Sequence, residues 1–182
     1  MNYVVGIDIS GNPEIGNLLD IKDLFHLIKA NNLKLTIHVA EIADSADENE
    51  FIIKHIRPNR VGHAVFLSNH LKDFLHENPL PIEICPTSNL FTKSVLSIEK
   101  HPFIDFYSKD KTYPLCICTD DCGMFSTSIT SEQYLVAKTF KLTLNDLYDL
   151  NKNSMKIIFD QSETTINKLN TKFEEFKQKH LF

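Results

Sequence analysis

The sequence predicts an α/β protein built on a parallel sheet, and three observations support this fold class. Five short runs rich in Val, Ile, Leu and Cys have the length of buried strands and lie at residues 4–10, 33–41, 60–65, 81–88 and 115–121. They are largely continuous rather than alternating, which is typical of parallel strands covered on both faces. Strands alternate with helical patterns at roughly 20–35 residue spacing, which is typical of βα units.

The helical patterns come in two groups. Between strands, apolar residues recur at helical spacing over residues 18–30, 45–56 and 68–77. After residue 121 we expect no further strand and predict helices at residues 131–140, 144–159 and 163–179. No linker, repeat or low-complexity tract interrupts the chain, so we predict a single domain over residues 1–182.

Composition excludes several classes of protein. The chain has 182 residues, of which 42% are hydrophobic and 24% charged, and this balance argues against a disordered tail, a collagen-like rod or a coiled coil. A net charge of −5 argues against broad binding to nucleic acid. The sequence shows no apolar run long enough to span a membrane and no basic, then apolar, secretory start. We therefore expect a cytoplasmic protein with neither a membrane nor a nucleic acid as partner.

The four cysteines do not predict a disulfide framework. Cys116 and Cys118 alternate along a buried strand, and Cys85 lies in another apolar run, so we expect reduced core thiols. Cys122 lies beside the last strand, where it would be exposed. The spacing C-x-C-x3-C differs from the paired C-x-x-C of structural zinc sites, so we do not expect Cys116, Cys118 and Cys122 to form a metal site.

Chemically capable residues fall at the end of every predicted strand. They are Asp8, Ser10 and Gly11, then His38 and Glu41, then Arg60 and His63, then Glu83, Ser88 and Asn89, and finally Asp120 and Asp121. Burying an unpaired ionisable group is costly, so such residues are expected where strands leave the core. The carboxyl ends of parallel strands share one face, where α/β proteins place their active sites. The alternative is that polar residues merely begin the loops; for all five strands together we favour a site.

Each candidate also has a plain structural interpretation. His38 and Glu41 would point to opposite faces of a strand unless His38 closes it and Glu41 lies on the loop; a satisfied hydrogen-bonded pair is the alternative to a metal ligand beside a proton carrier. Asp120 and Asp121 repel each other unless a metal or a proton compensates, or they form an Asp-rich turn or helix cap. His63 would orient water or stabilise charge, or simply be a core histidine.

In combination these segments resemble the adenosine/AMP deaminase superfamily of metal-dependent hydrolases on a (β/α)8 barrel. The matching segments occur in the family's order: GIDISG at 6–11, HVAE at 38–41, RVGH at 60–63, EICPTSN at 83–89 and CTDD at 118–121. VVGIDISGNP and CTDDCGMFSTSITSEQY favour the adenosine deaminase-like branch, which acts on N6-methylated AMP. Typical adenosine deaminases have His-Ala-Gly-Glu and Asp-Asp-Pro where this chain has HVAE and Asp-Asp-Cys, which weakens the case for free adenosine.

The resemblance implies a role for each candidate residue. His38 and Asp120 would be ligands of one Zn²⁺ ion, Glu41 would protonate the purine at N1, and His63 would position or deprotonate the attacking water. Asp121 would hydrogen-bond the base near N7, and the Gly11 backbone would approach N3. The implied reaction is hydrolytic deamination at C6 of an adenine nucleoside or nucleotide, with an N6-methyl-AMP or AMP-like substrate giving IMP or inosine and an amine.

The family's zinc site also uses a His-x-His motif, which this sequence lacks. A complete barrel needs about 250 residues and eight strands. We therefore expect the C-terminal part of a longer enzyme, or a genuine half-barrel, with two further histidine ligands supplied by the missing N-terminal part. Such a sheet would have open edges and an uncovered apolar interior, through which another chain or segment would associate. We expect the isolated chain to be inactive.

Two other functions remain open. The chain would be a catalytically inactive half-barrel that binds a purine or a partner chain, or another amidohydrolase acting on a different ring. The joint presence of His38, Glu41, His63, Asp120 and Asp121 favours the enzyme, and the missing His-x-His favours the inactive protein.

Overall fold

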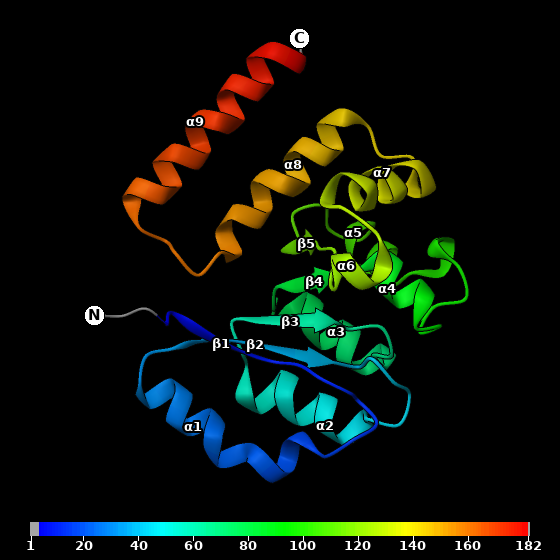
Figure 1. Ribbon diagram of the computed structural model, residues 1–182, viewed down its shortest axis with the longest axis vertical. Helices are drawn as coiled ribbons and strands as arrows, with labels where there is room; N and C mark the ends of the chain where they lie inside the picture. The colour runs from blue at the N-terminus through cyan, green and yellow to red at the C-terminus, as the bar shows by residue number, and fades with distance from the viewer. Residues whose placement is uncertain (1–3, 182) are drawn as a thin grey trace.

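A computed structural model describes residues 4–181, so residues 1–3 and 182 of the predicted domain lie outside the described part. Its centre is one parallel sheet of five strands in the order β1-β2-β3-β4-β5 (Figure 1). The strands are β1 (Gly6–Ile9), β2 (Lys34–Val39), β3 (Arg60–His63), β4 (Ile82–Ile84) and β5 (Leu115–Ile117). The predicted α/β class and all five strands are confirmed, although each strand is shorter than predicted.

The predicted helices are present with small changes at their ends. They are α1 (Lys22–Ala30), α2 (Ala46–Phe51), α3 (Asn69–Glu77), α7 (Ile129–Phe140), α8 (Leu144–Ser154) and α9 (Glu163–His180). A 3-10 turn, η1 (Leu18–Ile21), precedes α1, a π-helical turn, η2 (Ile52–Ile56), extends α2, and η4 (Met155–Ile157) extends α8. The prediction missed α4 (Pro86–Phe91), η3 (Ile98–Lys100), α5 (Phe103–Tyr107) and α6 (Cys122–Phe125).

The largest error concerns residues 85–88, which were predicted as the end of a strand. Pro86 instead occupies the first turn of α4, where its missing N–H and fixed φ suit a helix start. A proline also cannot continue the hydrogen-bond ladder of a sheet. The chain therefore turns into a helix immediately after β4, and this brings Ser88 and Asn89 over the strand ends.

The two faces of the sheet differ more than the apolar composition of the strands predicted. On one face, Leu35, Ile37 and Val39 of β2 are buried in the core that includes Phe25 and Ile52. The other face carries mostly polar residues, which are neighbours across adjacent strands. The register places Asp8 beside Thr36 and Thr36 beside Arg60. It also places Gly62 beside Glu83 and Glu83 beside Cys116. The prediction of an apolar interior is therefore wrong, because this second face carries polar and charged side chains.

The polar face carries its own network of contacts. Arg60 Nε lies 2.6 Å from Glu83 Oε1, and Thr36 Oγ1 donates to Glu83 Oε2 at 3.0 Å. The Arg60 guanidinium also lies 3.8 Å from the centre of the Phe159 ring and donates to the carbonyl of Ile157 at 3.1 Å. The segment that follows α8 thus returns to the sheet and covers part of this face. Among the described strands, β1 and β5 each pair with a single neighbour, and association through these edges stays a prediction.

In the described residues the cysteine prediction is confirmed for Cys85 and Cys122 and is wrong in placing Cys116 and Cys118 in the core. All four thiols are free, Cys85 is buried and Cys122 is exposed. Cys116 and Cys118 share the polar face of the sheet with their sulfurs 3.7 Å apart, and both are half-buried rather than part of the core. Within residues 4–181, none of the helices combines the length and the apolar composition needed to cross a membrane.

Ile37 offers a direct test of the packing under the sheet. Its side chain is completely buried, so Ile37→Ala is expected to lower the free energy of unfolding by about 2–5 kcal/mol. Leu96 is 82% exposed, and Leu96→Ala should change it by no more than about 0.5 kcal/mol. Urea denaturation of the wild type and of each variant measures both values. Equal effects of the two substitutions would contradict the packing described.

Candidate active site

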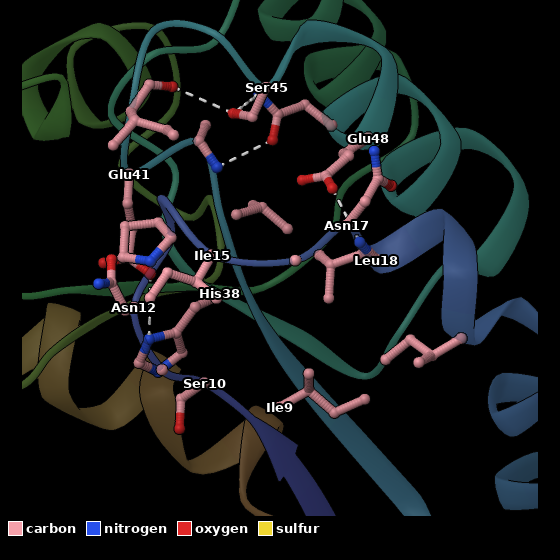
Figure 2. Close-up of a pocket in the computed structure, with 18 of the residues that line it drawn as sticks. Ile9, Ser10, Asn12, Ile15, Asn17, Leu18, His38, Glu41, Ser45 and Glu48 are labelled. Atoms are coloured by element: carbon pink, nitrogen blue, oxygen red, sulfur yellow. Dashed lines mark hydrogen bonds and ion pairs between the residues drawn. The ribbon is translucent and has the colours of Figure 1, made fainter.

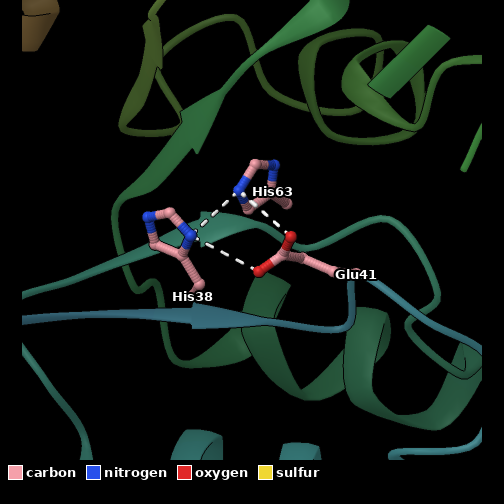
Figure 3. Close-up of side chains that lie close together, drawn as sticks. All are labelled: His38, Glu41 and His63. Carbon is pink, nitrogen blue, oxygen red and sulfur yellow. Dashed lines mark hydrogen bonds and ion pairs between the residues drawn. The ribbon is translucent and has the colours of Figure 1, made fainter. Parts of the chain in front are cut away.

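Four of the predicted site residues meet at the carboxyl ends of the strands. His63 lies at their centre: its Nε2 is 3.1 Å from His38 Nδ1, 3.7 Å from Glu41 Oε2 and 3.9 Å from Asp120 Oδ2. His38 Nδ1 is also 3.4 Å from Glu41 Oε1. Figure 3 shows His38, Glu41 and His63 pointing toward one another from the ends of β2 and β3. The predicted shared face is therefore a real cluster of titratable groups, called the strand-end cluster below.

Left-handed backbone at the strand ends directs these side chains. Ala40, His63, Ala64 and Asp120 have φ of 54°, 62°, 54° and 54° respectively. Residues other than glycine adopt this conformation at a cost of about 1–3 kcal/mol, and they do so preferentially at functional sites. The turn at Ala40 takes Glu41 out of the strand, so Glu41 and His38 share a site despite their spacing of three. The sequence analysis predicted a shared site only if Glu41 lay on the loop after the strand, and the structure has this arrangement.

Neighbouring groups hold the turn after β2 in place. The Ala40 N–H donates to the Oδ1 of buried Asn49 at 2.8 Å, and the Ala40 carbonyl accepts from the Phe66 N–H at 2.8 Å. The His38 ring packs over Gly62 of the neighbouring strand, where an added Cβ would lie only 2.8 Å from His38 Cδ2. Glycine at this position therefore lets the two histidine rings meet edge to face, with their centres 4.6 Å apart.

Helix α4 supplies the partners of two cluster residues. Ser88 Oγ donates to Asp120 Oδ2 at 2.6 Å, and the Asn89 side-chain amide lies 3.1 Å from His63 Nδ1. The fully buried carboxylate of Glu132 accepts from the Thr87 N–H at 3.0 Å and so fixes the first turn of α4. From the sequence, Ser88 and Asn89 are recognisable only as polar residues at the end of a predicted strand, because no helix is predicted there.

His101 is a buried polar residue that the sequence did not single out. Its Nε2 lies 3.1 Å from Asn89 Oδ1, and its Nδ1 accepts from the Phe103 N–H at 3.1 Å. The side chain is 1% exposed. A histidine between η3 and α5, before a proline, has no motif that would distinguish it from a surface residue, and only the folded structure brings it to Asn89.

Burial and charge move the pKa values of the three histidines in different directions. Burial lowers the pKa of His63. Burial, with a smaller contribution from His63, lowers the pKa of His101 to about 4. Burial also acts on His38, but the hydrogen bond and charge of Glu41, with the charges of Asp8 and Asp120, outweigh it and raise the pKa of His38. His101 is therefore neutral near pH 7, while His38 is the histidine most ready to be positively charged.

A cavity of about 370 Å³ opens beside the strand-end cluster. It is lined by Ser10, Gly11 and Asn12 of the segment that follows β1 and by His38 and Glu41 at the end of β2. Figure 2 shows Ser10, Asn12, His38 and Glu41 close together. Its volume lies at the lower end of the range of small-molecule sites. Gly11 has φ of +145°, a conformation that requires glycine, and no atom of the described chain lies within 4 Å of an added Cβ there.

Asp121 and Asp8 lie at the margin of the site. Asp121 is exposed at the start of α6 and is outside the strand-end cluster, so its predicted contact with a substrate stays a prediction. Asp8, at the end of β1, places Oδ1 3.8 Å from His38 Nε2. The sequence had marked Asp8 as a strand-end residue without giving it a role.

The donor atoms of the cluster suit a divalent cation. Within the described residues, two groups of donors have all their atoms within 4.8 Å of one another, His38 with Glu41 and His63, and His63 with Cys85 and Asp120. Imidazole, carboxylate and thiolate groups are the usual ligands of zinc. The two predicted ligands, His38 and Asp120, belong to different groups, and His63 is the member that the groups share.

Comparisons with known proteins point to one family. The adenosine deaminase family model matches residues 2–172. The N6-methyl-AMP deaminase of Mus musculus is 37% identical over 186 residues, which cover 99% of this chain and 51% of that protein. The chain thus spans about half the length of the curated relatives it matches.

Solved structures agree with the sequence matches. An ADAL–IMP complex has a TM-score of 0.90 at 33% identity, and Arabidopsis ADAL complexed with GMP has a TM-score of 0.91 at 33% identity. Each match covers 97% of this chain and 51% of the solved one. The five-stranded sheet and its helices therefore correspond to about half of the barrel-type fold that the sequence resemblance implied.

The lowered pKa of His101 predicts how stability depends on pH. Between its unfolded value of 6.5 and about 4, the unfolded chain binds a proton that the folded chain does not. The contribution of neutral His101 is therefore complete above pH 6.5 and is lost as the pH falls toward 4. We expect the wild type to lose stability relative to His101→Gln, by up to about 1.4 kcal/mol per pH unit in this window. Urea unfolding between pH 4.5 and 7.5 tests this, and parallel curves for the two proteins would contradict it.

Proposed function

The chain belongs to the adenosine deaminase family, and from this premise we propose that it carries catalytic residues of an aminohydrolase acting at C6 of a purine nucleotide. The observation that supports the proposal is the strand-end cluster of His38, Glu41, His63 and Asp120 beside a cavity of about 370 Å³. The two histidines and two carboxylates of the strand-end cluster can act both as proton carriers and as ligands of a cation.

The proposed substrate is a purine nucleoside monophosphate with an amino or methylamino group at C6. The relatives named N6-methyl-AMP deaminase and the complexes with IMP and GMP support this choice. IMP and GMP both carry oxygen at C6, as the product of such a reaction would. From N6-methyl-AMP and water the products would be IMP and methylamine, and from AMP they would be IMP and ammonia. The alternative substrate is an adenine nucleoside, which would give inosine.

The roles of the residues follow from the bonds that change. A water oxygen bonds to C6 while one proton of that water is transferred to N1. The C6–N bond then breaks, and the amine leaves with the proton of the new C6 hydroxyl group, which becomes the C6 carbonyl. We assign proton delivery at N1 to Glu41, whose carboxyl is mostly buried in the cluster. His63 would orient the attacking water. Asp121 would hydrogen-bond the base at N7, which requires a protonated carboxyl because N7 only accepts. The Gly11 backbone would face N3.

The donor set fits one zinc ion, and we propose His38 and Asp120 as its ligands in this chain. Two further histidines would come from a His-x-His segment, which this sequence does not contain. When bound, the ion would lower the pKa of a water molecule so that hydroxide is available near neutral pH. Ser88, which donates to Asp120 at 2.6 Å, would fix that carboxylate's orientation.

Glu41→Gln tests the assignment most simply. Because the amide cannot carry the proton to N1, kcat for N6-methyl-AMP is expected to fall by about 10²–10⁴-fold. Binding of IMP should change little, since the substitution keeps the size of the side chain. Glu175→Gln, on an exposed face of α9, is the matched control and should leave kcat unchanged. The rate is measured as production of IMP and methylamine by the natural-length protein, meaning this chain together with any segment that precedes or follows it in the gene product. An unaffected Glu41→Gln enzyme would overturn the role of Glu41.

One observation favours a second function, a catalytically inactive protein that binds a purine. The sequence lacks the His-x-His motif that would complete the metal ligands. We expect the 182-residue chain alone to bind IMP weakly and to show no zinc-dependent turnover, whereas the natural-length protein turns over N6-methyl-AMP. Turnover by the isolated chain would refute the first expectation. IMP binding without turnover by the natural-length protein would support the inactive protein instead.

A further inference from the structure

We propose that Asn89 and His101 are positioning residues that hold His63 in the tautomer with its hydrogen on Nε2. In this tautomer His63 donates a hydrogen bond into the site and does not accept one there. The inference deepens the proposed function and rests on it, because it defines what His63 does to the attacking water. Four contacts form a continuous series from the backbone of α5 to the strand-end cluster.

The series begins at a group whose direction is fixed. The backbone N–H of Phe103 can only donate, and it lies 3.1 Å from His101 Nδ1. The Nδ1 atom therefore carries a lone pair. His101 is neutral near pH 7 because burial lowers its pKa to about 4, so its single ring hydrogen is on Nε2.

The Asn89 side chain carries this donor-to-acceptor order on to His63. His101 Nε2 lies 3.1 Å from Asn89 Oδ1, and an N–H requires an acceptor opposite it. The amide oxygen of Asn89 must face His101, and its NH₂ group must face His63 Nδ1, which lies 3.1 Å away. A flipped amide would set donor against donor at His101. Both side chains are only 1% exposed, so solvent cannot compensate for that mismatch.

The last step assigns the hydrogen of His63. Its Nδ1 accepts from the Asn89 amide, so the neutral ring carries its hydrogen on Nε2. The carboxylates around Nε2 agree with this assignment, because Glu41 Oε2 and Asp120 Oδ2, at 3.7 and 3.9 Å, have lone pairs. His63 would thus stabilise negative charge on the attacking oxygen. The proton that leaves the water would go to a carboxylate, and Glu41 could pass the same proton on to N1.

The conservative variants separate this role from simple packing. His101→Gln keeps both functions of the imidazole, because its amide oxygen accepts from Phe103 and its NH₂ donates to Asn89. His101→Leu keeps the bulk and loses both. Asn89→Asp keeps the size but replaces the donor facing His63 with an acceptor, so it is expected to move the His63 hydrogen to Nδ1.

Two measurements on the natural-length protein test the proposal. Nitrogen-15 NMR of labelled histidine, with His63 assigned from its loss in His63→Phe, reports the tautomer without requiring activity. We expect hydrogen on Nε2 in the wild type and in His101→Gln, and on Nδ1 in Asn89→Asp.

The second measurement is the rate of deamination of N6-methyl-AMP. His101→Gln should retain kcat within about threefold, and His101→Leu should lose about 10–100-fold in kcat, as for other supporting residues. Asn89→Asp should lose up to about 10⁴-fold, the effect of a catalytic histidine held in the wrong tautomer. KM should stay within about threefold throughout.

The possible outcomes are distinct. Hydrogen on Nδ1 of wild-type His63, an unchanged tautomer in Asn89→Asp, or equal losses in His101→Gln and His101→Leu would each overturn the proposal. If His101→Leu does not fold, the wild-type spectrum and Asn89→Asp still decide it. A protein with hydrogen on Nε2 of His63 that deaminates no purine nucleotide would support the tautomer and refute the proposed function.

Discussion

The site depends on two hydrogen bonds made by one short helix. From α4, Asn89 reaches His63 on β3, and Ser88 reaches Asp120 beyond β5. Asn89 and Ser88 thereby fix cluster groups that come from two strands which are not neighbours in the sheet. Buried Glu132 in turn secures the first turn of α4. A shift of α4 would therefore move an imidazole and a carboxylate at once, and the strand-end cluster would lose its geometry.

The division of the sheet into two faces explains how the protein tolerates so many polar groups. One face of the sheet contributes Ile37, Val61 and Ile82, which are completely buried in the core. That apolar core stabilises the fold, while the other face and the strand ends carry ionisable groups and left-handed residues that cost free energy. Two of these groups have specific partners: Arg60 forms an ion pair with Glu83, and buried His63 forms a hydrogen bond with Asn89. The site is thus built where strands leave the core.

Much of this organisation follows from sequence, and the reasons for the failures are specific. Strands were predictable because apolar runs with polar ends mark where a buried segment emerges, and this pattern also found His38, Glu41, His63 and Asp120. Helix α4 was missed because six residues beginning with proline show no helical periodicity. His101 was missed because its importance arises from a contact with Asn89, twelve residues away, which no local pattern encodes.

The central claim is that the cavity beside the strand-end cluster receives the purine ring with C6 toward Glu41 and His63. A crystal structure of the natural-length protein with IMP tests it most directly. The account predicts the base in the cavity lined by Ser10–Asn12 and His38–Glu41, with N1 within hydrogen-bond distance of the Glu41 carboxyl and the C6 oxygen facing His63 Nε2. A nucleotide bound elsewhere, or bound with its six-membered ring turned away from Glu41, would contradict it.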